Sequence, residues 1–177
     1  MLRLRYFVPV LILFFLGYVS EIKSQEGNTE ANVKAVLVYK FTKFLHWPEN
    51  ADRDTFKIGV LGDAEIASAL KIITHEQLIK KKPAKIEELN PSTPLKSYNI
   101  IFLSQKSTMD IKNVLQKIQG EPVLLIGDKE GFGEKGAGIN LIKQDGKIKF
   151  EINLSSLREN GIESNTQFIN LASVLYD

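Results

Sequence analysis

The sequence predicts a single compact α/β domain in which a mixed β-sheet has helices on both faces. In the first half of the chain, short apolar segments with the length of strands alternate with segments of helical periodicity, as in a βαβ unit. In the second half, Asp145-Gly146 lies between two alternating segments, which is the strongest short-range signal of an antiparallel hairpin. The length of 177 residues, 44% of them hydrophobic, suits one core.

The first helix is expected over residues 32–47, where apolar side chains recur on one broad face. Pro48 should end this helix, because the residue before a proline is disfavoured in the α conformation. Residues 25–30 are polar and are expected to be mobile.

Between residues 56 and 126, apolar strands alternate with capped helices. Asp63 can cap the first of these helices, and Ser107 with Asp110 matches a capping box for the second. Lys80 to Lys82 are expected to form a solvated run of charge. The expected elements are strands at 56–61, 84–89, 99–103 and 122–126, and helices at 64–74 and 108–119.

The hairpin is expected to pair residues 138–144 with residues 147–154. Its alternation separates an apolar face from a polar one. A two-residue turn predicts the opposite pairs Leu141–Phe150, Ile139–Ile152 and Asn140–Glu151. The polar face is predicted to contain Lys147, Lys149, Glu151 and Asn153.

Two helices are expected after the hairpin. Ser156 and Glu159 match a capping box for a short helix that stops near Gly161. A last helix should start at Asn165 or Thr166. The apolar residues expected on its inner face are Phe168, Leu171, Ala172 and Leu175.

Residues 1–24 have the features of a cleavable secretory signal peptide. Two arginines precede the apolar segment 7–19, which is shorter than the roughly 20 residues that span a membrane. Cleavage is expected after Ser24, which leaves residues 25–177 as one domain outside the cytoplasm. An uncleaved membrane anchor is the alternative.

Charge and composition narrow the function. The net charge is +2, and without the first 24 residues, which hold Arg3, Arg5, Glu21 and Lys23, the chain has 20 basic and 20 acidic residues. Proteins that bind nucleic acids usually concentrate positive charge on one surface, so no nucleic-acid partner is expected. The lack of cysteine excludes disulfides, thiolate metal sites and cysteine nucleophiles.

No motif indicates a cofactor, a metal site or a catalytic site. The G-x-G-x-x-G pattern at 131–136 precedes a strand, whereas a dinucleotide site requires a helix there, so we interpret it as a mobile loop ahead of the hairpin. His46 and His75 are the only histidines and lack the spacing of zinc ligands. There is no G-x-S-x-G nucleophile elbow, and no pair of carboxylates is singled out as acid and base.

Three ordered motifs cover nearly the whole chain beyond the predicted signal peptide. They are VKA at 33–35 with YKFTKF at 39–44 and Trp47-Pro48, then FKIGVLG at 56–62, then VLLIGD at 123–128 with Gly131-Phe132 and FEINL at 150–154. Taken together, they resemble the YfiR/HmsC-like family of periplasmic proteins.

The resemblance implies a compact α/β domain without catalytic activity. Better-known family members bind the periplasmic portion of a membrane diguanylate cyclase and hold down its output, which limits biofilm signalling, and an outer-membrane lipoprotein can sequester them. Repressors of this type carry disulfides, so their redox control is not expected here. The family often has arginine where this chain has Lys149, which keeps the charge without the bidentate fork.

The leading hypothesis is a non-catalytic periplasmic regulator that binds a membrane signalling protein, either a diguanylate cyclase or a histidine kinase. We expect Phe41 and Phe44 to pack in the core, whereas Trp47, at the end of the helix, is either a further core residue or an exposed anchor for a partner. The candidate partner-binding residues, taken from the motifs and the polar face, are Lys43, His46, Trp47, Lys149, Glu151 and Asn153.

Two other functions are compatible with the sequence. A small-ligand sensor would have its pocket between the glycine-rich loop and the strand ends, where open α/β sheets bind ligands. An exported hydrolase would use carboxylates that the sequence does not identify. A homodimer is compatible with each of these functions.

Overall fold

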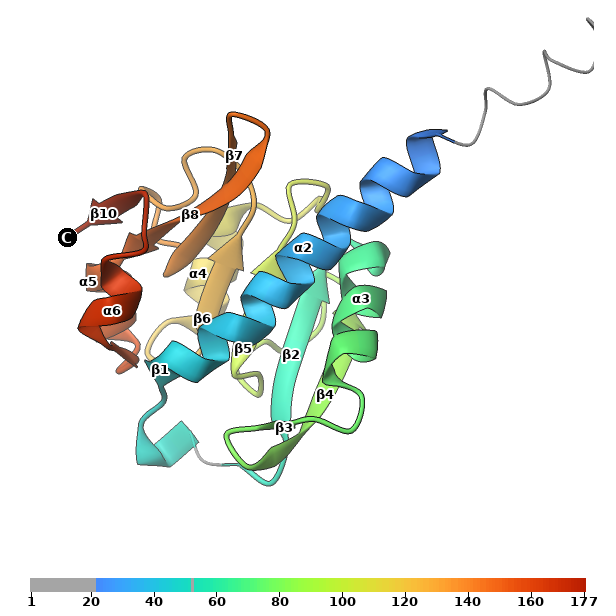
Figure 1. Cartoon of the computed structure of the whole chain (residues 1–177). Coiled ribbons are helices and arrows are strands. Elements are labelled where there is room, and N and C mark those ends of the chain that lie inside the picture. The colour runs from blue at the N-terminus through green and yellow to red at the C-terminus, as the bar shows by residue number, and fades with distance from the viewer. Residues whose placement is uncertain (1–21, 52) are drawn as a thin grey trace, which may run out of the picture.

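The computed structural model describes residues 22–51 and 53–177, and it confirms the predicted α/β class (Figure 1). An eight-stranded mixed sheet forms the centre of the domain. In spatial order its strands are β10 (Val174–Tyr176), β8 (Lys147–Asn153), β7 (Ile139–Gln144), β6 (Leu124–Gly127), β5 (Ile100–Leu103), β2 (Phe56–Leu61), β4 (Lys82–Leu89) and β3 (Leu78–Ile79).

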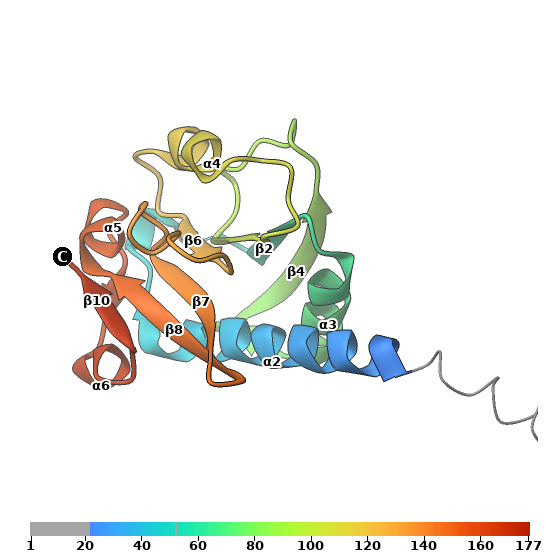
Figure 2. The same ribbon diagram turned by 90° about the horizontal axis from the view of Figure 1, so that it is seen from above.

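Helices cover both faces of this sheet, as predicted. α2 (Ile22–Phe44) and α3 (Ala64–Thr74) lie side by side on one face, and α4 (Ile111–Ile118) lies on the other (Figure 2). The short helices α5 (Leu154–Glu159) and α6 (Thr166–Ile169) lie near the edge formed by β8 and β10. Each face has its own cluster of buried apolar side chains, so the sheet separates two hydrophobic cores.

The strand directions agree with the prediction. β2 pairs in parallel with β4 and with β5, and the parallel pairing continues from β5 to β6 and from β6 to β7. β7 and β8 form the predicted antiparallel hairpin, with Asn140 opposite Glu151. Asp145 and Gly146 both have positive φ, as a type I′ turn requires.

The capping prediction is confirmed for α3 and corrected for α4. Asp63 accepts hydrogen bonds from two amides in the first turn of α3. α4 begins at Ile111 rather than at residue 108, because Asp110 is its N-cap. Ser107 Oγ instead accepts a hydrogen bond from the Met109 amide in the preceding loop.

The first helix differs from the prediction at both ends. α2 begins at Ile22, so residues 25–30, which the sequence predicts to be mobile, are helical. It ends at Phe44, because Leu45–His46 form a short strand, β1, that pairs with the distant β9 (Glu163–Ser164) and buries Leu45. Tertiary pairing therefore overrides the local helical pattern. The predicted signal peptide lies outside the described residues, apart from its last three.

A second hairpin lies at Lys80 to Lys82, where the sequence predicts only a solvated run of charge. Lys80 and Lys81 form the tight turn between β3 and β4, and both have positive φ. Lys82 is the first residue of β4. The sequence gives no sign of this turn, because it lacks the Asn-Gly or Asp-Gly pair that favours positive φ.

The carboxyl-terminal segment also differs from the prediction. α5 is capped by Asn153, whose side chain accepts a hydrogen bond from the Ser156 amide, and not by Ser156. α6 stops at Ile169, and Val174–Tyr176 then form β10 in parallel with β8. The Val-Leu-Tyr sequence favours a strand. Leu171 and Leu175, which are predicted to face inward, are exposed.

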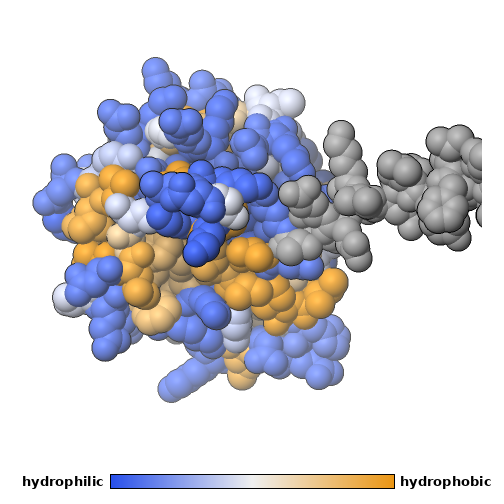
Figure 3. All heavy atoms as spheres, turned by 45° about the horizontal axis from the view of Figure 1, so that its top comes forward, coloured by the Kyte–Doolittle hydropathy of each residue, from blue (hydrophilic) through white to orange (hydrophobic). Residues whose placement is uncertain are grey.

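Apolar residues on the surface gather in patches between hydrophilic residues (Figure 3). The exposed large apolar side chains are Val33, Ile72, Leu78, Leu171, Val174 and Leu175. Within residues 22–51 and 53–177, no helix has the combination of length and apolar character needed to cross a membrane.

Candidate partner-binding cleft

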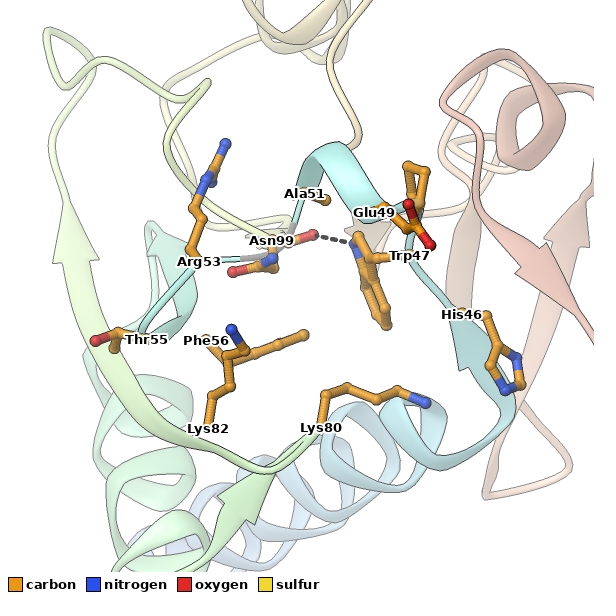
Figure 4. A pocket seen from close by; sticks show the side chains of 11 residues that line it. His46, Trp47, Glu49, Ala51, Arg53, Thr55, Phe56, Lys80, Lys82 and Asn99 are labelled. Carbon is orange, nitrogen blue, oxygen red and sulfur yellow. Dashed lines mark hydrogen bonds between the residues drawn. The ribbon is translucent and has the colours of Figure 1, made fainter.

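A cleft of about 500 Å³ opens where β2 and β4 begin and just before β5. It lies between the segment that follows α2, which includes the 3₁₀-helix η1 (Glu49–Ala51), and the β3–β4 hairpin (Figure 4). We call it the Trp47 cleft. Its lining residues are His46, Trp47, Pro48, Glu49, Ala51, Arg53, Thr55, Phe56, Lys80, Lys82 and Asn99.

Trp47 forms one wall of the cleft and is half-buried. Its ring meets the Phe56 ring edge-on, with centroids 5.1 Å apart. Its Nε1 donates a hydrogen bond to the backbone oxygen of Asn99 at 3.2 Å (Figure 4). These contacts hold the indole in place, so Trp47 packs against the core with one part and lines the cleft with another.

Basic side chains line much of the remaining wall. Lys80 and Lys82 come from the β3–β4 hairpin, on the other side of the cleft from Glu49 (Figure 4). Arg53 Nη2 donates to the Lys96 backbone oxygen at 2.9 Å, which directs the guanidinium away from the indole. Burial and the nearby positive charge of Lys43 lower the pKa of the Lys80 amine.

The structure brings three of the six predicted site residues together. His46 and Trp47 line the cleft, and His46 is exposed on β1. Lys43, in the last turn of α2, is exposed next to the cleft, with its amine 4.8 Å from the centre of the Tyr39 ring. It is close enough to Lys80 to affect that pKa.

The other three predicted residues lie on β8, and the part of its polar face that contains Glu151 and Asn153 is covered. The carboxylate of Glu151 is buried: it accepts hydrogen bonds from Asn140 Nδ2 at 2.9 Å and from the Tyr176 hydroxyl at 3.2 Å. Asn153 is also buried, and its Nδ2 donates to the backbone oxygen of Gly133 at 2.9 Å. Both side chains therefore have structural partners.

Lys149 is the third of these residues, and its amine donates to Gln144 Oε1 at 2.8 Å across the hairpin. The glycine-rich loop at 131–136 covers Glu151, and a side chain at Gly133 would collide with that carboxylate. The loop is thus part of the packing around β8.

A second cavity, of about 580 Å³, lies at the carboxyl end of β6. Lys34 on α2 reaches it and contacts Asp128 Oδ2 and Glu30 Oε1, each at 2.9 Å. We call Glu30, Lys34 and Asp128 the α2–β6 ion cluster. Burial favours the neutral Lys34 amine, but the hydrogen bonds to the two carboxylates outweigh it, so the pKa of Lys34 is raised.

The sequence did not single out this cluster or the lysines of the cleft. Asp128 directly follows a buried strand, where open α/β sheets collect polar groups, which was an available signal. Nothing local indicates that Lys34, 94 positions earlier, is its partner. Within the described ranges, no group of three His, Cys, Asp or Glu residues is placed to hold a metal ion.

Comparison with known proteins identifies the family. The sequence model of the YfiR/HmsC-like family matches residues 31–173, which is most of the chain. The chain belongs to the YfiR/HmsC-like family. This family consists of periplasmic regulatory proteins without catalytic activity, so the alternative of an exported hydrolase gains no support. No curated protein matches the chain.

Two solved structures share the fold. One is a conserved domain protein from Vibrio cholerae, with 14% identity and a TM-score of 0.50 over 67% of this chain and 54% of that one. The other is the ABC domain in complex with L-Trp from Streptococcus pneumonia, with 11% identity and a TM-score of 0.50 over 68% of this chain and 55% of that one. The YfiR/HmsC-like chain therefore spans about half the length of each.

The contacts of Trp47 predict different costs for two substitutions. Trp47→Phe should retain the aromatic wall but lose the hydrogen bond to Asn99, which costs about 1 kcal/mol of stability. Trp47→Ala should also lose the packing on Phe56 and cost about 2–3 kcal/mol, less than a fully buried aromatic residue. Urea unfolding of both variants measures the difference, and equal costs would contradict the packing role.

Proposed function

We propose that this protein is a periplasmic regulator that binds the extracytoplasmic portion of a membrane diguanylate cyclase and represses it. The observation that carries the proposal is the family match over residues 31–173. The expected signal peptide and the lack of a recognisable catalytic motif support it. Binding changes the activity of the partner only if the regulator has different affinities for its active and inactive states. An outer-membrane lipoprotein that sequesters the regulator fits the same scheme.

The Trp47 cleft is our candidate for the partner surface. It presents a half-buried tryptophan among basic side chains. Tryptophan is enriched at the energetic centres of interfaces, and charges around such a centre steer the encounter with a partner of opposite charge. Glu151 and Asn153 are already engaged in hydrogen bonds within the domain. The cleft is therefore a stronger candidate than β8.

Deletion of the gene should raise the cellular concentration of cyclic di-GMP, because a repressed cyclase is released. The measurement is nucleotide extraction and mass spectrometry in the parent, the deletion strain and the deletion strain complemented with the wild-type gene. Complementation should restore the parental concentration. Unchanged cyclic di-GMP, with altered phosphorylation of a membrane histidine kinase, would move the proposal to that partner. Unchanged output from every candidate cyclase and kinase would remove it.

A small-ligand sensor is the second candidate, and the cavity beside the α2–β6 ion cluster favours it. Its volume of about 580 Å³ lies within the usual range for small-molecule sites, and charged groups line it. A rise in melting temperature with one class of metabolite, together with no protein partner in a pull-down, would favour the sensor. The L-Trp complex of the Streptococcus protein makes amino acids a reasonable first class to screen.

A further inference from the structure

Among the described residues, the wall of the Trp47 cleft has more basic than acidic side chains. Lys80, Lys82 and Arg53 line it, and the carboxylate among these described residues is that of Glu49. Within the described residues, the amine of Lys80 has no hydrogen bond or ion pair, and Lys80 is exposed. Its charge is therefore available to an incoming group.

Lys43 adds a second cation beside Lys80. Apart from burial, the charge of Lys43 is what lowers the pKa of Lys80, so the two amines repel each other. The ring of Tyr39 is the neighbour of the Lys43 amine, and it provides no negative charge. A carboxylate bound near both amines would replace this repulsion by two attractions.

An aromatic wall stands next to these cations. Trp47 and Phe56 meet edge-on, and Pro48 continues the apolar surface along the lining of the cleft. Such a surface buries an apolar side chain, whereas the lysines select the charge of its neighbours. The combination fits a segment in which carboxylates flank an apolar or aromatic residue.

We propose that the Trp47 cleft binds an acidic segment of the signalling partner, with carboxylates near Lys43 and Lys80 and an apolar side chain against Trp47. This inference rests on the proposed function, because it names the chemistry of the partner at the same surface. Charge complementarity speeds the encounter of the two proteins and disfavours basic segments.

Trp47 itself can report the binding, because it is the only tryptophan of the chain. The probe is a blocked pentapeptide with Glu and Asp on both sides of a central phenylalanine, and its control has Gln and Asn at those positions. Titration of the purified chain with the acidic peptide should give a saturable change in fluorescence. The amide peptide should bind about tenfold or more weakly, and added salt should weaken the acidic peptide.

Charge-removing variants locate the site. The double variant Lys43→Gln/Lys80→Gln should bind the acidic peptide about fivefold or more weakly than the wild type, because it loses two ion pairs of ordinary surface strength. Lys112→Gln is the matched control, since this exposed lysine lies on α4, on the opposite face of the sheet, and should have no effect. Equal affinity for both peptides, or an equal loss in both variants, would overturn the inference.

Complementation of the deletion strain separates this inference from the proposed function. Restoration of repression by the wild-type gene and by Lys112→Gln, but not by a stably produced double variant, supports both. If the double variant represses as well as the wild type, the regulatory function stands and the acidic-segment inference fails. If the deletion has no effect on signalling, the proposed function fails, and the inference about this partner fails with it.

Discussion

Replacing Lys34 with methionine should lower the free energy of unfolding by about 3–5 kcal/mol, the usual cost of removing one partner from a buried ion pair. The Asp128 side chain is only 1% exposed, and Lys34 is its cationic partner in the structure. The variant leaves this carboxylate buried without a counter-charge, while methionine preserves most of the packing volume. Urea unfolding at neutral pH measures the effect.

Lys143→Met is the matched control for this experiment. Lys143 also contacts Glu30, at 3.1 Å, but its side chain is 56% exposed. Removal of an exposed pair costs about 0–1 kcal/mol. A double variant, Lys34→Met with Asp128→Leu, should recover part of the lost stability, because no buried charge is left unpaired. Equal costs for Lys34→Met and Lys143→Met would show that the burial of Asp128 does not matter.

The same variant should change the response of stability to acid. Hydrogen bonding to Lys34 lowers the pKa of Glu30 below its ordinary value, with a smaller contribution from Lys143. A lowered pKa contributes stability that is present above the unfolded pKa of about 4.3 and is lost as the pH falls through the folded value. The raised pKa of Lys34 contributes stability that is present below the unfolded pKa of about 10.4, and this contribution is lost as the pH rises through the folded value. Lys34→Met should therefore lose less stability than the wild type between pH 5 and about pH 3.

The parts of the fold that the sequence predicts are those determined by neighbouring residues. Asp145-Gly146 sets the register of the β7–β8 hairpin through its own backbone conformation. Asp63 starts α3 by accepting hydrogen bonds from amides only two and three residues further along the chain. β5 and β6 are apolar throughout, so their burial on both faces is visible in the sequence.

The remaining features depend on contacts between distant residues. The helical pattern continues past Phe44, yet Leu45–His46 leave the helix because β9 offers a strand partner. β10 likewise becomes a strand because β8 presents an open edge to it. A periodic pattern shows which residues form an apolar face. It does not show which distant strand will form hydrogen bonds with their backbone.

The candidate site likewise combines residues that a local sequence signal marks with residues that only distant contacts bring together. The motif that contains Trp47 was visible in the sequence, and the residue does line a cleft. Lys80 reaches the same cleft from a hairpin whose turn has no glycine or asparagine, so no local signal marks it. Glu151 alternates correctly onto the polar side of β8, but Tyr176 and the loop at 131–136 cover that side.

Phe168→Ala should also lower the free energy of unfolding by about 3–5 kcal/mol, as expected for a buried aromatic residue. Phe168 is 1% exposed and joins helices and sheet from the two halves of the chain. Its ring stacks on Phe150 of β8 at 5.2 Å and on Phe44 of α2 at 5.4 Å, and it meets Phe41 edge-on at 5.4 Å. Alanine would remove all three contacts and leave a cavity that these rigid elements cannot easily close.

Leu171→Ala is the control for this prediction, because Leu171 lies three residues further along but is 62% exposed. Its removal should change stability by less than about 0.5 kcal/mol. Phe168→Leu should lie between the two, because leucine fills part of the space but loses the aromatic contacts. Urea unfolding of the three variants under one condition gives the order. A small loss for Phe168→Ala would mean that α6 is not anchored to α2 and β8, and that the aromatic cluster does not hold the carboxyl-terminal segment against the sheet.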